Sequence, residues 1–407
     1  MPTQLVEIGF DLVLPTGPFF TLDDATKGRL DNTSFRLAGF AYYDVTDYVT
    51  NIEVTRGKSD DIDNISSGEL VVELNNRTRA FDPEYADSPF FGNILPKRVV
   101  RYSVNGVQQY QGVIDDWGLN YTPDGDALAN FVASDGFVYL NNQTLGAGTA
   151  TVQSSGARIS AILDDPFVAW PPADRSIATG VTTVGANVVE DGQNALAYLQ
   201  LVEQGELGLF FISKDGKAVF RERNYAPSTS GITQFRDDGT GIGYQNLVVS
   251  YGSENLVNEV DSTSVITTTQ TLSVDTASQQ EYGIFNQTFS DLLLNTDSQV
   301  AEFNATLLAK YSQPVYRFSE LEVRLNSLTE ADQNKVLALE LGDFVQVVFT
   351  PSGIPPAINK FAQVIRANHS VDISGEHIVT LGLNTLNFTY LILDDTIFGK
   401  LDEGSLS

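Results

Sequence analysis

The chain has 407 residues, 42% of them hydrophobic and 19% charged, which is enough apolar material for a globular protein of two to four domains and excludes a disordered chain. It contains no cysteine, which excludes disulfides, thiolate metal sites and a cysteine nucleophile. Its formal net charge of -28 opposes binding to nucleic acid, and we interpret the acidity mainly as a means of keeping a large assembly soluble.

The first fifteen residues are MPTQLVEIGFDLVLP, an acidic segment with no basic region before its apolar residues. No stretch of the chain approaches the ~18 uninterrupted apolar residues that a membrane-spanning helix requires. We therefore expect neither a signal peptide nor a membrane-embedded segment. Two strands are predicted further on, where apolar and polar residues alternate in YVTNIEVTRG and ELVVELNN.

The clearest local signal lies in residues 98–135. Two strand patterns, RVVRYSV and VQQYQGVI, flank Asn105-Gly106, a pair that accepts the positive φ angles of a type I′ turn. They predict a β-hairpin, which the turn at 122–126 extends into an antiparallel meander. We interpret residues 1–143 as one β domain.

A small α+β module is predicted over residues 144–243. It follows a stretch at 141–156 rich in Gly, Ala, Thr and Ser, which is typical of a linker or of a surface excursion between domains. The pattern ARISAILDD predicts a short helix, and Asp191 is a candidate N-cap for a second one. A second hairpin is predicted where LGLFFIS and AVFRER surround Asp215-Gly216.

Strand patterns return from Asn246 onward and predict a second β domain over residues 244–394, with a terminal tail at 395–407. Asp297 opens a predicted helix, and Ser327 and Glu330 match a capping box for a short one. The last predicted strands are DFVQVVFT, KFAQVIRA, EHIVTLGL and FTYLIL. The fold class is therefore mainly β, a β-rich α+β protein with a small module between two antiparallel β domains.

Adjacent carboxylates are the first candidates for catalysis, because glycoside hydrolysis requires two carboxylates a fixed distance apart. In a chain with 52 acidic residues such pairs are expected by composition alone, and no His, Lys or aromatic cluster frames them. We therefore favour loops and helix caps for these pairs: Asp60-Asp61, Asp115-Asp116, Asp164-Asp165 and Asp394-Asp395.

The two histidines, His369 and His377, could form a metal site with Asp372 or Glu376. Zinc usually takes three or four well-placed ligands, and the intervening Ser-Gly predicts a turn. The acidic loops at 59–63 and 123–126 could hold calcium through oxygen ligands, but neither matches the EF-hand pattern. With no GxSxG, Walker A, GxGxxG or HExxH motif, we assign no catalytic, cofactor-binding or metal-binding residue and expect no enzymatic activity.

The most specific patterns lie in residues 48–117, which resemble minor tail or baseplate hub proteins of siphophages. Further on, LVEQGELGLFFISKDGKAVFRER resembles the small domain of phage late-control and hub proteins, and residues from 341 onward resemble the closing β domain of that family. Residues 260–300 carry no recognisable match. Four motifs carry the main resemblance: Arg56-Gly57-Lys58-Ser59, Leu74–Pro83, Ser88–Gly92 and Gly112–Trp117.

This resemblance implies a tail-tip hub in the virion, assembled in the cytoplasm of the bacterial host. Three copies would each supply two tube-like β domains, and the resulting pseudo-sixfold ring would continue the hexameric tail tube. The implied partners are a distal tail protein ring, a tape-measure protein and tail-tip or fibre proteins. Viral DNA would pass through the ring without specific binding, and acidic walls would repel its phosphates.

Other functions stay open at this stage. A hexameric distal tail adaptor also begins with a tube-like β domain, and a carbohydrate-active or receptor-binding tail protein would use a carboxylate pair or exposed aromatic residues. The ends of the chain also share a pattern, LDDATKGRLD at Leu22–Asp31 and LDDTIFGKLD at Leu393–Asp402. We favour chance and similar turn chemistry for this repeat over docking into equivalent grooves.

Overall fold

The computed structural model describes residues 1–11, 40–59, 63–225 and 232–385. The described part is mainly β with six α-helices, which confirms the predicted β-rich α+β class. None of these helices combines the length and apolar character needed to cross a membrane. Both copies of the repeated LDD pattern and the predicted strand FTYLIL lie outside the described residues.

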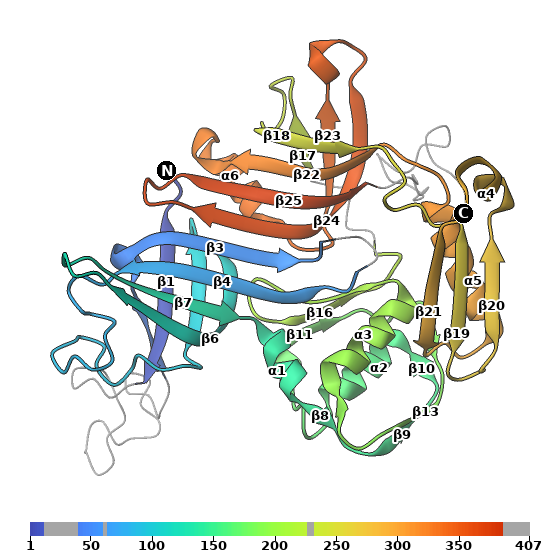
Figure 1. Cartoon of the computed structure of the whole chain (residues 1–407), viewed down its shortest axis with the longest axis horizontal. Coiled ribbons are helices and arrows are strands. Elements are labelled where there is room, and N and C mark those ends of the chain that lie inside the picture. Colours follow the sequence, from blue (N-terminus) through green and yellow to red (C-terminus); the bar gives the residue numbers. More distant parts are fainter. Residues whose placement is uncertain (12–39, 60–62, 226–231, 386–407) are drawn as a thin grey trace.

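Strands from the N-terminal and C-terminal parts of the described chain form one 13-stranded sheet. At its centre β3 (Val49–Gly57) pairs antiparallel with β24 (Ile358–Val371), so that N-terminal and C-terminal strands form a continuous sheet (Figure 1). The N-terminal strands are β1 (Gln4–Asp11), β2 (Phe40–Asp44), β4 (Ser66–Asn75), β5 (Val99–Val104), β6 (Val107–Tyr121) and β7 (Ala127–Ser134). The C-terminal strands are β17 (Thr233–Arg236), β18 (Asn246–Ser250), β22 (Arg317–Arg324), β23 (Phe344–Phe349) and β25 (His377–Thr385).

The predicted hairpin is confirmed by β5 and β6, which pair antiparallel around a turn with φ of 50° at Asn105 and 76° at Gly106. Such positive angles match the right-handed twist of the two strands. β6 continues into β7 through the turn at 122–126, as expected for the meander. Alternate residues of β7 are buried, so the apolar face of this meander packs on the core.

The small module contains α1 (Gly136–Asn142), α2 (Ser155–Leu163) and α3 (Ala195–Glu206). Asn194, and not Asp191, caps α3, because its side chain accepts a hydrogen bond from the N–H of Ala197 at 2.9 Å. The predicted linker at 141–156 is also wrong, since its three short strands each pair with a strand from residues 183–194. The strands of the module are β8 (Thr144–Leu145), β9 (Gly148–Ala150), β10 (Gln153–Ser154), β11 (Arg175–Ile177), β12 (Thr183–Val184), β13 (Asn187–Val189), β14 (Gln193–Asn194), β15 (Leu209–Ile212) and β16 (Ala218–Arg221).

Residues 257–311 form a lobe with a hydrophobic cluster of its own, which we call the α5 lobe. It consists of α4 (Thr276–Tyr282), the predicted helix α5 (Asp297–Tyr311) and a three-stranded sheet of β19 (Glu259–Ser264), β20 (Gln270–Val274) and β21 (Asn286–Leu292). The rest of the described chain shares one hydrophobic core that extends from β1 to β25. The lobe therefore has an apolar cluster separate from the main core.

The last α-helix is α6 (Glu330–Ala338), and its N-cap lies two residues after Ser327, the predicted N-cap. The N-cap is Thr329, whose hydroxyl donates to the Asp332 carboxylate and accepts from the backbone N–H of Asp332. Thr329 and Asp332 thus take the roles predicted for Ser327 and Glu330. Short 3₁₀ helices complete the described elements at Thr46–Tyr48, Pro172–Asp174, Leu325–Ser327 and Pro351–Gly353.

Candidate functional site

The Arg56-Gly57-Lys58 motif lies where three parts of the molecule meet. Arg56 is buried at the end of β3, and its guanidinium donates to the Ile212 carbonyl of the small module at 2.9 Å. The same group forms an ion pair at 2.7 Å with Glu340, which follows α6 in the C-terminal part. One side chain therefore ties the N-terminal sheet to both other parts, and we call this region the joint.

Gly57 brings the backbone of β3 unusually close to β24. Its φ is +110°, and a Cβ at this position would lie 2.2 Å from the carbonyl oxygen of Ile365. The next N–H, that of Lys58, donates to the same oxygen at 3.0 Å. Only glycine satisfies both the left-handed backbone and the close approach, which explains the glycine of the motif physically.

Lys214, in the turn of the β15–β16 hairpin, binds the C-terminal end of α6. Its ammonium donates to the carbonyls of Leu337 at 2.7 Å and Ala338 at 2.9 Å, where the partial negative charge of a helix terminus favours a cation. Its backbone N–H donates to Glu340 at 2.9 Å. The hairpin predicted around Asp215-Gly216 thus contributes a second basic side chain to the joint.

The carboxylate of Glu340 lies between these two cations. Burial alone would raise its pKa, but the charge of Arg56 and the backbone N–H groups of Lys214 and Leu341 outweigh burial, and the pKa of Glu340 lies below its usual value. Burial lowers the pKa of Lys214, against the attraction of Glu340. The joint is therefore a largely buried, charge-compensated network, in which loss of one partner leaves an uncompensated charge.

A chain of polar side chains fastens β1 to the β24–β25 hairpin. The Tyr102 hydroxyl donates to the side-chain oxygen Oε1 of Gln4, and the side-chain nitrogen Nε2 of Gln4 donates to Nδ1 of His377 at 3.1 Å. With Nδ1 as acceptor, Nε2 of His377 carries the proton and donates to Nδ1 of His369 at 3.0 Å. Burial lowers the pKa of His377 to about 4 and that of His369 well below its usual value, so both rings are neutral.

The two histidines therefore form a hydrogen bond with each other. The turn predicted between them is confirmed, with Asp372 accepting backbone hydrogen bonds from Ser374 and Glu376. Within the described ranges, no group of three or more His, Cys, Asp or Glu side chains is arranged to hold a metal ion.

Three of the motifs that carry the family resemblance converge on one aromatic cluster. Phe81, Phe90 and Trp117 each come from a different motif, and the ring of Phe81 stacks on that of Phe90 at 5.3 Å and on that of Trp117 at 5.9 Å. These rings attach the long loop between β4 and β5 to β6. The aromatic residues of these three motifs are thus explained by their packing against one another.

The described acidic pairs are used in turns and ion pairs. Asp115 pairs with Lys97, and Asp164 pairs with Arg175 at 2.8 Å. In the second candidate calcium loop, Asp126 pairs with Arg77 at 2.8 Å. Asp60-Asp61 and Asp394-Asp395 lie outside the described residues, as does most of the loop at 59–63.

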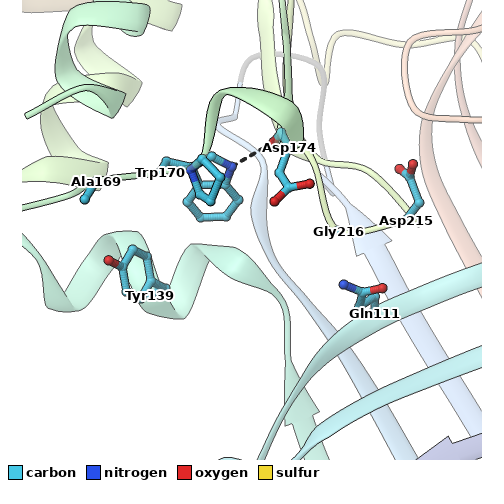
Figure 2. A pocket seen from close by; sticks show the side chains of 8 residues that line it. Gln111, Tyr139, Ala169, Trp170, Asp174, Asp215 and Gly216 are labelled. Atoms are coloured by element: carbon cyan, nitrogen blue, oxygen red, sulfur yellow. Dashed lines mark hydrogen bonds between the residues drawn. The ribbon is translucent and has the colours of Figure 1, made fainter. Parts of the chain in front are cut away.

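Two cavities lie beside the small module. The smaller, about 260 Å³, is lined by Tyr139, Trp170 and Asp174, and Figure 2 shows the Trp170 indole donating to the backbone oxygen of Asp174 at 2.7 Å. Asp215 lines both this cavity and a neighbouring one of about 470 Å³. Because Lys217 pairs with Asp215 at 2.6 Å, neither cavity presents two unengaged carboxylates for hydrolysis.

The small module also contains two buried charges that sequence reasoning missed. Arg158 is 1% exposed and donates to the Tyr198 hydroxyl at 2.6 Å and to the Gly185 carbonyl at 2.8 Å. Glu206 is fully buried and accepts from the backbone N–H groups of Val181 at 3.0 Å and Thr182 at 2.8 Å. The one available signal was a basic residue inside the apolar pattern ARISAIL, at the start of a predicted helix.

The main path of the large sheet ends at β2 on one side and at β18 on the other, and a branch from β24 through β23 ends at β17. Among the described strands, β2 pairs only with β1 and β18 pairs only with β22. Such edges expose N–H and C=O groups that pair readily with a neighbouring chain. The described residues therefore form one continuous sheet that is fixed by the joint at its centre and has β2 and β18 as edge strands.

No protein-family model and no curated protein matches this sequence. Among solved structures, the chain is similar to a tail protein from Neisseria meningitidis, with a TM-score of 0.58, 10% identity, and coverage of 85% of this chain and 94% of that chain. It is also similar to the 43 kDa tail protein of prophage MuSo2 from Shewanella oneidensis, with a TM-score of 0.55, 14% identity, and coverage of 84% and 95%. The chain thus shares the fold of these two tail proteins over most of its length.

Proposed function

We propose that this chain is a structural, non-enzymatic subunit of a bacteriophage tail and forms the hub of a siphophage tail tip. The observation that carries the proposal is the β3–β24 pairing, which joins two groups of strands edge to edge and leaves β2 and β18 with one partner each among the described strands. The fold shared with the Neisseria meningitidis tail protein and with the prophage MuSo2 tail protein supports the same assignment.

In this proposal the tube-like β domains span residues 1–143 and 244–394, and residues 144–243 form the module between them. Three chains then supply six β domains, which matches the symmetry of a hexameric tube. Joining the open edges of neighbouring chains in a closed ring removes an aggregation hazard. The distal tail ring, the tape-measure protein and the tail-tip or fibre proteins are the proposed partners.

The same proposal assigns a role to the acidity of the chain. DNA that leaves the virion would pass through the ring, and a wall of carboxylates repels phosphate and prevents adhesion. The formal net charge of -28 supports this assignment. A ring whose lumen is lined mainly by Lys and Arg would contradict it.

Cryo-electron microscopy of the tail tip of the intact virion tests the proposal. We expect three copies of the chain around the tail axis, directly beyond a hexameric ring, with β2 and β18 of neighbouring copies in contact. Six copies would instead identify the chain as a distal tail adaptor. Copies at the periphery of the tip would favour receptor binding or glycan cleavage.

A further inference from the structure

The sheet of the α5 lobe ends in a strand edge that no other described strand covers. Its outer strand β20 pairs with β19 and with no other described strand. Figure 1 shows β20 at the rim of the molecule, on the side of the lobe away from α3. The backbone groups along this rim are thus positioned to pair with an added strand.

The side chains of β20 alternate between the lobe interior and solvent. The Ser273 hydroxyl accepts a hydrogen bond from Asn304 of α5, whereas Leu272 and Val274 point away from α5 and are 59% and 39% exposed. Residues 262–274 contain no charged residue and no proline. Because edge strands are normally protected by lysine, proline or a bulge, this edge lacks the usual barriers to pairing.

Carboxylates surround this uncharged edge. Glu259 and Asp261 on β19 lie directly opposite Val274 and Leu272. One oxygen of Asp261 accepts from Gln270 at 2.6 Å, while the other is buried and has no hydrogen-bond partner within the described part of the chain. The whole α5 lobe contains seven carboxylates against one basic residue, Lys310.

We propose that the β20 edge binds an extended segment of a different, basic polypeptide, which adds a strand to the lobe. The uncharged core of that segment, rich in β-branched residues, would pair with β20, and flanking Lys or Arg residues would face the acidic surroundings. A second copy of this chain is the less suitable occupant, because it would place one acidic lobe against another acidic surface. The proposal does not depend on the hub function, since the open edges β2 and β18 lie on a different sheet.

Two synthetic peptides of about ten residues, the length of an ordinary strand, test this proposal against the full chain. Both have an alternating Thr-Val core, one with lysine pairs at each end and the other with glutamate pairs. We expect the lysine-flanked peptide to bind, measured by fluorescence anisotropy, and its binding to slow amide hydrogen exchange in β20. The glutamate-flanked peptide should bind at least about tenfold more weakly, and added salt should weaken the lysine-flanked complex.

The variant Leu272→Lys/Val274→Lys places two cations on the edge and should lower the affinity for the lysine-flanked peptide at least about tenfold. Ile373→Lys is the matched control, because Ile373 is 82% exposed in the β24–β25 turn, and the affinity should stay unchanged. Circular dichroism checks that both variants fold. The proposal is overturned if the wild-type chain binds neither peptide, if it binds both equally, or if the edge variant binds like the control.

Sedimentation velocity tests whether a second copy of this chain occupies the β20 edge. If the wild-type chain self-associates and Leu272→Lys/Val274→Lys abolishes that association, the edge binds a second copy and the basic partner is wrong. Unchanged self-association in this variant is the expected result. Failure of the hub proposal would instead appear as a stoichiometry other than three in the virion, so the two failures are distinguishable.

Discussion

The joint and the α5 lobe differ in how their polar groups are satisfied. In the joint, the buried Arg56 pairs with Glu340, Lys214 lies half-buried beside them, and the parts that they connect share one hydrophobic core. The lobe has a cluster of its own and leaves an uncharged edge strand in solvent. Buried charge pairs need one geometry to stay compensated, whereas an open edge requires a partner to complete it. The joint is thus built for rigidity, and the lobe is built to bind.

The largest effect is expected from breaking the joint. Arg56→Met leaves Glu340 as a buried carboxylate without its ion-pair partner, which should lower the free energy of unfolding by about 3 to 5 kcal/mol in urea denaturation. Arg77→Met is the control, because the Arg77–Asp126 pair is 64% and 52% exposed and should contribute less than about 1 kcal/mol. Equal losses in the two variants would contradict a special role for the joint.

Acid should weaken the attachment of β1 to the β24–β25 hairpin. Burial lowers the pKa of His377 from its ordinary 6.5 to about 4, so between these values the unfolded chain binds more protons than the folded one. Stability should therefore fall as pH falls from about 6.5 to 4, by about 3 kcal/mol for this residue, and should not change above that range on its account.

The measurement is the difference in unfolding free energy between the wild-type chain and His377→Gln, at pH 7 and at pH 4.5. This difference is required because burial raises the pKa of Asp135 to about 6 and that of Glu203 to about 7, which changes stability in the opposite direction. A pH dependence that is identical in the two proteins would show that His377 does not titrate as inferred.

The close approach of β3 and β24 should tolerate no side chain at Gly57. Gly57→Ala combines a φ of +110° with a Cβ 2.2 Å from a carbonyl oxygen, and we expect a loss of about 2 to 3 kcal/mol in thermal unfolding. Gly125→Ala is the matched control, because its φ is +95° but open space surrounds it, and about 1 kcal/mol should be lost there. Similar losses would mean that backbone strain alone, and not the contact, explains the glycine.

The smallest effect on stability is expected at the lobe edge. Leu272→Lys replaces a side chain that is 59% exposed, so the free energy of unfolding should change by less than about 0.5 kcal/mol. Differential scanning calorimetry measures this change. A loss above about 2 kcal/mol would show that Leu272 is buried in solution, for example against a second copy, and would remove the contrast between the lobe and the joint.

Local patterns predicted the individual elements well where the chemistry was local. The positive φ angles of Asn105 and Gly106 follow from residue type, and the hairpin that they form needs no distant contact. The N-cap at Asn194 was missed because Asp191 is an equally good capping residue by type, and the choice depends on where the pairing of β14 with β8 ends. The predicted linker at 141–156 was wrong for a similar reason, since small residues form strands when distant partners supply the pairing.

The candidate site was less predictable than the elements. The sequence indicated that Arg56-Gly57-Lys58 is a specific motif, but nothing near it identified Glu340 as its partner, because 284 residues separate the two. The histidine pair illustrates the same limit. The Ser-Gly pair predicted the turn between the two histidines, whereas the contact with Gln4 depends on the position of β1 at the other end of the chain.

The sequence by itself determined the β-rich fold class, the hairpins and the absence of any disulfide or thiolate chemistry, because these depend on residue type and short-range periodicity. Only the tertiary structure decided that two groups of strands merge at β3 and β24, that acidic and basic side chains meet at the joint, and that β20 is an edge strand among the described residues. These features depend on pairing and desolvation between residues far apart in the chain, and such contacts leave no periodic signal in the sequence.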